Sequence, residues 1–246
     1  MIKRQTIRKT IIISMALLFP ITITWISPAL PVIYAAFDGI MTGAVIIFFL
    51  QFLASLFLGR AFCGYVCPSG GLQECVMRVG EKRIKNPKVN IIKYIIWTPW
   101  VLTIIILFIH AGGVHEVDFF AGTDNNWIFL IEPYRYIIYF GVIFLIVASH
   151  LIVGNRAACH CVCWMAPFMI IGTKVSQRLR LPRLRLTSDK ESCTGCNQCT
   201  KKCPMSLDVK KMVMTEEMKN SECILCGECV DYCPKKAIAY SFKNKD

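Results

Sequence analysis

The sequence predicts an α-helical membrane protein with four transmembrane helices in a two-fold internal repeat, followed by a small cysteine-rich α+β domain. Three observations predict it. Hydrophobic residues make up 55% of the 246 residues and are concentrated before residue 172, which is too apolar for an ordinary soluble domain. One eight-residue pattern occurs twice in this apolar part. Eight of the 14 cysteines then fall in two regularly spaced runs after residue 188.

Four apolar runs are long enough to cross a bilayer, which takes about 20 residues of helix. Prolines interrupt the first run at Pro20, Pro28 and Pro31, and the third at Pro99. The approximate limits of the runs are Thr10–Tyr34, Gly39–Phe62, Ile91–Ala111 and Arg135–Val153. We expect one transmembrane helix in each run, within a membrane domain of residues 1–172.

Basic residues predict the orientation of these helices. Lys3, Arg4, Arg8 and Lys9 precede the first run, and seven more Lys and Arg lie in the segment from Arg60 to Lys93, whereas the stretches 33–39 and 111–133 contain none. Since Lys and Arg stay on the cytoplasmic side, we expect a multi-pass protein of the cell inner (cytoplasmic) membrane with both termini cytoplasmic. This clustering also explains the net charge of +12 without nucleic acid, for which no motif is present. A cleaved signal peptide is the alternative for the first run, but no small-residue cleavage site ends it.

The repeated pattern lies at the ends of the second and fourth runs. Residues Arg60–Cys67 match residues Arg156–Cys163 at an offset of 96 positions. Each copy follows an apolar run, contains a C-x3-C spacing and precedes a mixed apolar and basic segment. Repeats of this kind often place a shared site at the interface between the two halves.

The two C-terminal cysteine runs indicate iron-sulfur chemistry. Both read C-x2-C-x2-C-x3-C-P. The first run begins at Cys193 and the second begins 30 residues later, at Cys223. Three thiolates two residues apart can surround one corner of a 4Fe-4S cluster. Zinc sites use two C-x2-C pairs per metal and would leave half of these cysteines without a role. Disulfides would need an oxidising compartment.

This segment resembles the bacterial two-cluster ferredoxins, in which the fourth cysteine of each run binds the other cluster. The resemblance implies a cytoplasmic 2x4Fe-4S ferredoxin domain over residues 188–246, in which Ala237 and Ile238 fit the closing strand. It implies that cluster one takes Cys193, Cys196, Cys199 and Cys233. It implies that cluster two takes Cys223, Cys226, Cys229 and Cys203.

Residues 173–187 connect the two parts and carry five basic side chains among leucines. We expect a basic interfacial linker that lies on anionic membrane lipid and holds the ferredoxin domain at the membrane. Docking of an acidic soluble electron carrier, such as a ferredoxin or flavodoxin, is the alternative. The basic residues are Lys174, Arg178, Arg180, Arg183 and Arg185.

As a whole the chain resembles the NapH-type membrane polyferredoxins, whose core the NosR-type electron donors share. The resemblance rests on the ferredoxin-type cysteines and on the C-x3-C motifs after the second and fourth apolar runs. Two features depart from the family. Trp164 stands where the family has proline, so only Pro68 of that pair is present. No segment resembles the external flavin-binding domain of the NosR branch, so that role is not carried over.

Four cysteines of the repeat are candidate ligands of a third centre: Cys63, Cys67, Cys159 and Cys163. Residues four apart share one face of a helix, so each pair is expected to project its thiols together. Four thiolates suit an iron-sulfur cluster or a soft metal, and Arg60 and Arg156 one turn earlier would favour thiolates. Reversible thiol redox chemistry and a plain structural role are the alternatives.

These features predict a membrane-anchored electron-transfer protein. Single electrons would pass through two 4Fe-4S clusters between a cytoplasmic redox carrier and a membrane or external reductase partner, or the quinone pool. His150, at the cytoplasmic end of the fourth run, is a candidate quinone contact. The alternative is a maturation, assembly or redox-sensing factor that keeps a metal or thiol centre of another enzyme reduced. The sequence shows no catalytic residues, so we expect a non-catalytic subunit of an oxidoreductase system.

Overall fold

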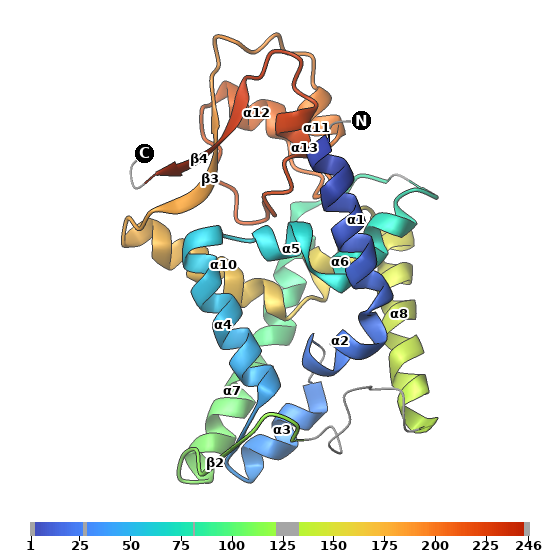
Figure 1. The fold of residues 1–246 in the computed structure, drawn as a ribbon, viewed down its shortest axis with the longest axis vertical. Helices are drawn as coiled ribbons and strands as arrows, with labels where there is room; N and C mark the ends of the chain where they lie inside the picture. The colour runs from blue at the N-terminus through green and yellow to red at the C-terminus, as the bar shows by residue number, and fades with distance from the viewer. Residues whose placement is uncertain (1–2, 27–28, 81, 122–132, 244–246) are drawn as a thin grey trace.

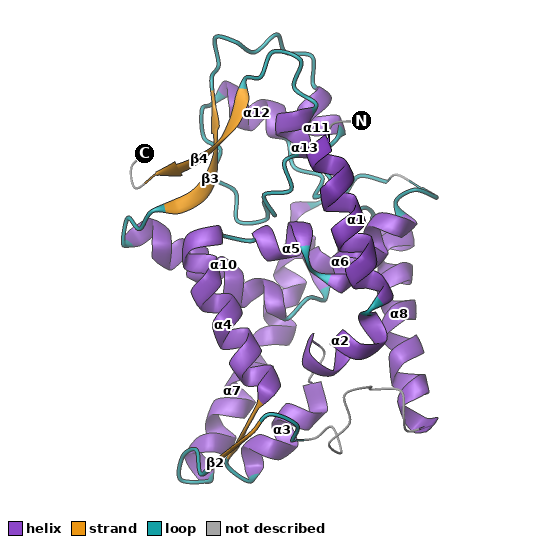
Figure 2. Cartoon of the chain, in the orientation of Figure 1, coloured by secondary structure: helices purple, strands orange, loops and turns teal. Residues whose placement is uncertain are grey.

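The computed structural model describes residues 3–26, 29–80, 82–121 and 133–243. Helices α3, α4, α7 and α8 extend toward one end of the molecule, and the C-terminal segment with its short helices and two strands lies at the other end (Figure 1). Figure 2 shows that the first part is almost entirely helical, whereas loops make up much of the second.

The first apolar run does not form one helix, so that prediction is wrong. The chain instead forms α1 (Lys3–Leu17), α2 (Phe19–Ile26) and α3 (Ala29–Phe37). Pro20 accounts for the first break, because proline lacks a backbone N–H and fits only the first turn of a helix, which is where it lies in α2. Helix α1 also begins seven residues before the predicted limit at Thr10.

The other three apolar runs each contain one main helix. Two helices in the described residues are long and apolar enough to cross a membrane, one over Pro87–His110 and one over Arg135–Val153. They consist of η1 (Pro87–Ile91) with α7 (Ile92–His110), and of α8 (Pro133–Val153). Helix α4 (Gly43–Leu58) is apolar but has only 16 residues. Four membrane crossings therefore remain a prediction, of which two are matched by helices of spanning length in the described residues.

Each C-x3-C motif is followed by a further helix. In the first half these elements are α5 (Ala61–Tyr65) and α6 (Pro68–Val76), and in the second they are α9 (Ala157–Cys161) and α10 (Met165–Arg178). The halves interlock, because α4 packs against α10 and α8 packs against α6. On the side away from the cysteines, β1 (Ile40–Thr42) pairs in parallel with β2 (Glu116–Asp118).

The predicted linker at residues 173–187 is not a separate segment. Its first half belongs to α10, and from Arg183 onward it forms β3 (Arg183–Ser188). Strand β3 pairs antiparallel with β4 (Ile238–Lys243), so that Ser188 lies opposite Ile238. The ferredoxin-like segment thus begins before residue 188, since its sheet needs β3. Between the strands lie three short helices: α11 (Gln198–Lys201), α12 (Val209–Met214) and α13 (Glu228–Asp231).

Candidate metal centres

One cavity of the C-terminal segment is lined by all four cysteines of the predicted cluster-one set: Cys193, Cys196, Cys199 and Cys233. The first three come from the loop after β3 and from α11. Gly195 and Asn197 adopt positive φ angles of 71° and 61°, which lets the chain turn tightly around the cavity. Cys196 is exposed to solvent, whereas Cys199 is buried. This cavity therefore lies near the surface.

A second cavity is lined by all four cysteines of the predicted cluster-two set: Cys203, Cys223, Cys226 and Cys229. The Tyr240 hydroxyl, from β4, donates a 2.5 Å hydrogen bond to the carbonyl oxygen of Leu225 and holds this loop in place. Gly227 has φ of 76° and lies so close to Tyr240 that a Cβ atom would come within 2.6 Å of its hydroxyl oxygen. Cys226 and Cys229 are both buried. The cysteines of this set are therefore more buried than those of the first set.

The thiols around the second cavity fit an iron-sulfur cluster. Burial raises the pKa of Cys203 and of Cys223 to about 11. It raises the pKa of Cys226 to about 12, although Arg8 opposes the shift. Such thiols ionise at neutral pH only with a bound cation, and iron binding would release their protons.

The donor arrangement does not suit a single metal ion. Within the described residues, no three His, Cys, Asp or Glu side chains converge closely enough to bind one ion. A 4Fe-4S cluster binds its four cysteines through four iron atoms, so its ligands stand further apart. All fourteen cysteines are free thiols in the described chain, which also argues against a disulfide framework.

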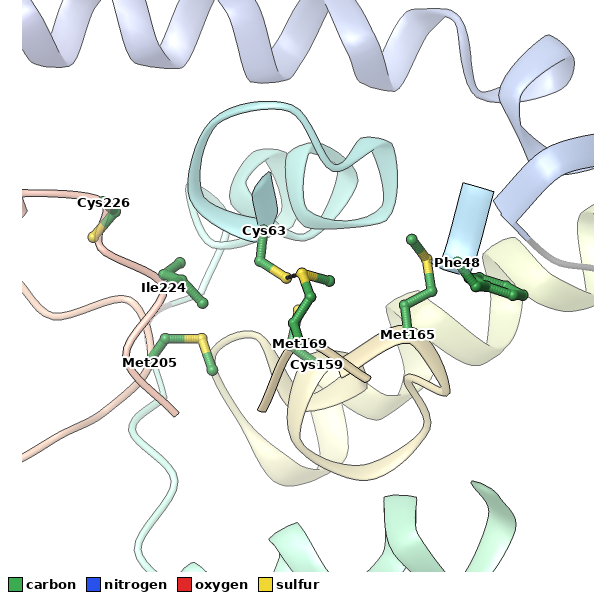
Figure 3. Close-up of a cluster of buried hydrophobic side chains, with 8 residues drawn as sticks. All are labelled: Phe48, Cys63, Cys159, Met165, Met169, Met205, Ile224 and Cys226. Atoms are coloured by element: carbon green, nitrogen blue, oxygen red, sulfur yellow. Dashed lines mark hydrogen bonds between the residues drawn. The ribbon is translucent and has the colours of Figure 1, made fainter. Parts of the chain in front are cut away.

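The membrane cysteines, which we define as Cys63, Cys67, Cys159 and Cys163, lie together beneath the second cavity. Cys63 and Cys159 are both in one buried cluster with Cys226, and Cys163 packs against it. Figure 3 shows Cys63 and Cys159 facing Met169, with Cys226 on the neighbouring loop. Burial and the thiols of the other three membrane cysteines raise the pKa of Cys67. The structure thus brings together the cysteines of both repeat halves and one predicted ligand of cluster two.

The prediction that each C-x3-C pair shares one helical face is wrong. Helix α5 ends at Tyr65, and Cys67 has an extended backbone with φ of −62° and ψ of 117° before α6 begins. Pro68 explains the break, because a residue before proline is disfavoured in the helical region. In the second half, α9 ends at Cys161, before Cys163. The four thiols converge through tight turns instead.

Two arginines predicted to favour thiolates do more than that. Burial raises the pKa of Cys63, whereas the positive charges of Arg60 and Arg156 act to lower it. The effect of burial is larger, so the pKa of Cys63 lies above its ordinary value. Arg60 donates to Glu222 at 2.9 Å and to the carbonyl oxygen of Ser221 at 3.0 Å. Arg60 therefore hydrogen-bonds to a carboxylate and a backbone oxygen, and its positive charge also lies close to the Cys63 thiol.

Glu222 is the centre of a buried ion-pair network between the two parts of the chain. Lys93, from α7, donates to its second oxygen at 2.5 Å, and His160 lies 4.0 Å from Glu222. Burial alone would raise the pKa of Glu222, but Arg60 and Lys93 lower it below its ordinary value. Glu222 directly precedes Cys223, so this network fixes the start of the second cysteine run against Arg60 and Lys93 of the helical part.

A second network joins α1, α6 and the other repeat half. Arg8 donates to Glu74 at 2.7 Å, to Glu228 at 2.9 Å and to the carbonyl oxygen of Gly64 at 3.0 Å. Arg156 also forms an ion pair with Glu74 and donates to the carbonyl oxygen of Cys63 at 2.8 Å. Both arginines are buried. Glu74 thus links the two halves at the membrane cysteines.

Gly64 lies directly against the loop that carries Cys226. A Cβ atom at this position would clash with the carbonyl oxygen of Ile224 and approach the Cα of Cys226 at 3.4 Å. Only glycine allows this distance between the two backbones without displacement. The absence of a side chain at Gly64 therefore sets how closely the ferredoxin segment approaches the membrane cysteines.

Sequence reasoning missed three of these residues. Gln73 donates to the sulfur of Cys159 at 3.3 Å and accepts a hydrogen bond from the backbone N–H of Ala158. Glu74 and Glu222 hold the arginines. The need for carboxylate partners could have been predicted, because arginines occur at the ends of apolar runs and a buried arginine needs an acidic partner.

Other predicted residues lie apart from these sites. His150 is buried and contacts the carbonyl oxygen of Gly80 at 3.1 Å through Nε2. Cys75 and Cys161 line neither of the two cysteine-lined cavities. The prediction that β4 contains Ile238 is confirmed, whereas Ala237 precedes the strand.

Comparison with known families supports both parts of this arrangement. Residues 40–87 match a family described as a 4Fe-4S binding domain, and this range contains Cys63 and Cys67. Residues 192–238 match a family described as a 4Fe-4S dicluster domain, and this range contains all eight cysteines of the two runs.

Several curated proteins are similar to most of the chain. An uncharacterised protein of Methanocaldococcus jannaschii is 27% identical over 82% of this chain and 71% of its own length. YccM of Escherichia coli, named as an electron transport protein, is 25% identical over 83% of this chain. The ferredoxin-type protein NapH of Haemophilus influenzae is 23% identical over 80% of it. The chain spans 55% of YccM and 66% of NapH.

No solved structure matches the chain significantly. The matched domains and the names of these relatives indicate iron-sulfur electron transport. The two regions that match 4Fe-4S domains, with YccM and NapH among the relatives, support a NapH-type polyferredoxin.

Proposed function

We propose that this protein is a membrane-anchored relay. It passes single electrons between a soluble redox carrier in the cytoplasm and a membrane partner or the quinone pool. The observation that carries the proposal is the buried contact group that contains Cys63, Cys159 and Cys226. This group connects a predicted ligand of the inner ferredoxin cluster to the membrane cysteines through buried side chains that include Ile224 and Met205.

The two ferredoxin clusters would be held by the cysteines around the two cavities. Cluster one takes Cys193, Cys196, Cys199 and Cys233, and cluster two takes Cys203, Cys223, Cys226 and Cys229. Bound clusters supply reversible one-electron chemistry, and their potentials follow from burial, charge and hydrogen bonds at sulfur. The chain itself supplies position and environment.

The outer and inner sites share one small core. Val209, Val213 and Ile238 are buried together with Cys199 of the first site and Cys229 of the second. Cys203 contacts both this core and the group around Cys63. The three sets of cysteines therefore form a series from the exposed Cys196 to the membrane cysteines.

We further propose that the membrane cysteines hold a third iron-sulfur centre. They come from both repeat halves, and Cys63 and Cys67 lie within the range that matches a 4Fe-4S binding domain. The buried Arg60 and Arg156 would offset the negative charge of such a centre. Gln73 would donate a hydrogen bond to its Cys159 ligand.

The proposed topology has four membrane crossings with both termini in the cytoplasm. Two helices of spanning length support the membrane placement, as do the basic residues near the ferredoxin segment. The reciprocal packing of α4 on α10 and α8 on α6 is what a two-fold arrangement of halves would produce. Anionic lipid would contact the basic residues of α10, including Lys174 and Arg178.

A vesicle assay tests the relay. Reduced methyl viologen supplies electrons outside vesicles that contain the protein and a membrane-soluble quinone, and quinone reduction is followed by absorbance. The variant Cys63→Ser with Cys159→Ser should lose quinone reduction and keep the EPR signals of both ferredoxin clusters. Cys75→Ser is the matched control, because it removes a thiol that lines neither cysteine-lined cavity. Undiminished quinone reduction in the double variant would refute the relay.

A further inference from the structure

Three acidic residues near cluster two pair with arginines that lie outside the ferredoxin segment. Glu222 pairs with Arg60 at 2.9 Å, and Glu228 pairs with Arg8 at 2.9 Å. Asp231, in α13, pairs with Arg4 at 2.6 Å. These carboxylates are therefore already neutralised within the chain and are not available to attract a partner protein.

Lysines line the cluster-one cavity, and the exposed carboxylates Asp189 and Glu191 precede its first cysteine in the chain. Lys210 and Lys235 line the same cavity as the four cluster-one cysteines. Lys201 ends α11 but, with Lys202, it lines a different cavity that also contains Arg8 and Glu228. Lys210 and Lys235, with their sequence neighbours, form the lysine face, which we define as Lys210, Lys211, Lys235 and Lys236. Among the described residues none of these four lysines forms an ion pair, and all except Lys210 are exposed.

Cluster one is also where an outside partner can approach. Cys196 is exposed, whereas the cluster-two cysteines are buried or half-buried beneath the membrane contacts. Electron transfer between proteins requires the two redox groups to come close, so an external carrier reaches cluster one first.

We infer that the lysine face is the docking surface for a small acidic electron-carrier protein, with cluster one as its electron-transfer partner. The inference rests on the proposed relay and names its cytoplasmic contact. The reduced carrier loses one electron and cluster one gains it; no covalent bond forms or breaks and no proton moves. Complementary charge steers such an encounter and makes it sensitive to salt.

The basic residues of the expected linker do not serve this contact. Arg183 and Arg185 lie in β3 and line a different cavity, together with Gly59 and Thr173. Lys174 and Arg178 lie in α10, which packs on α4. The basic residues that line the cluster-one cavity, Lys210 and Lys235, belong to the lysine face.

Binding and electron transfer can be measured separately. The full-length protein in nanodiscs is immobilised, and an acidic flavodoxin is the soluble probe. Binding is measured by biolayer interferometry at low salt and at about 0.15 M ionic strength, where the Debye length is about 8 Å. Stopped-flow absorbance then gives the rate at which reduced flavodoxin bleaches the clusters, with reduced methyl viologen as a reductant that needs no docking.

Lys210→Glu with Lys235→Glu should weaken flavodoxin binding and slow its reaction by about tenfold each, with iron content and the viologen rate unchanged. Lys85→Glu with Lys88→Glu, which reverses two exposed lysines elsewhere, should change neither. Equal binding of flavodoxin by the wild type and the Lys210/Lys235 variant would overturn the inference. A third variant, Lys174→Glu with Arg178→Glu, tests α10, and loss of binding in this variant alone would also overturn it. Lack of iron in the wild type would instead refute the relay itself.

Discussion

Arg60, the first residue of the repeated pattern Arg60–Cys67, donates a 2.9 Å hydrogen bond to Glu222, the residue directly before Cys223. Both side chains are buried, and they are 162 residues apart in the sequence. The contact fixes the cluster-two loop to the turn that carries Cys63. The distance between cluster two and the membrane cysteines is therefore set by ion pairs rather than by a flexible tether.

Replacing Glu222 by Gln should destabilise this junction. The substitution leaves Arg60 and Lys93 buried without their carboxylate, and breaking a buried ion pair from one side costs about 3–5 kcal/mol. We expect a lower midpoint of thermal unfolding and faster proteolysis between the two parts. Glu217→Gln, at an exposed position, is the control. Equal stability of the two variants would show that the network does not hold the ferredoxin segment.

Gly64→Ala should separate cluster two from the membrane cysteines. The added Cβ clashes with the carbonyl oxygen of Ile224, so the loop must move, and overpacking of this kind costs about 1–3 kcal/mol. We expect slower quinone reduction with both ferredoxin signals retained. Gly80→Ala is matched, since a Cβ there meets nothing within 4 Å. A normal rate in Gly64→Ala would contradict close contact as the basis of transfer.

Gln73→Met should lower the reduction potential of the proposed third centre. The wild-type amide donates a hydrogen bond to the sulfur of Cys159, and hydrogen bonds to sulfur are among the factors that set cluster potentials. Loss of the donor removes stabilisation of the more negative, reduced state. An EPR-monitored redox titration measures the shift. Gln177→Met, at an exposed position, should leave the potential unchanged; the same result for Gln73→Met would exclude this role.

Cys226→Ser and Cys196→Ser should each remove one ferredoxin cluster, or about four irons per chain. The two losses should differ in consequence. Cys226 lies in the buried contact group, so its loss should also destabilise the cytoplasmic segment, whereas Cys196 is exposed. Iron analysis and circular dichroism check this. Unchanged iron in both variants would overturn the ligand assignment.

Short-range patterns predicted much of the fold. Cysteine spacing predicts which thiols gather, and each predicted set of four lines one cavity. Hydrophobicity predicts helices over 91–111 and 135–153, and the structure has them over 87–110 and 135–153. The turn at Cys67 could also have been predicted from the sequence, because Pro68 disfavours the helical conformation of the preceding residue. The i, i+4 spacing of the cysteines wrongly suggested a continuous helix instead.

Long-range contacts could not be predicted in the same way. Nothing near Arg60 or Arg156 in the sequence specifies Glu222 or Glu74 as a partner, because those pairs form only when the two halves and the ferredoxin segment pack together. The position of Gly64 against Ile224 likewise depends on two backbones far apart in sequence. The sequence indicates the charges and the small residue, and the fold determines what they contact.

The most direct test of three centres in series is iron and acid-labile sulfide per chain, measured with EPR on anaerobically purified protein in detergent. The account predicts about twelve irons in the wild type and about eight in Cys63→Ser with Cys159→Ser, with one EPR signal lost. About eight irons in both proteins, with identical spectra, would contradict a third centre and leave the membrane cysteines as thiols.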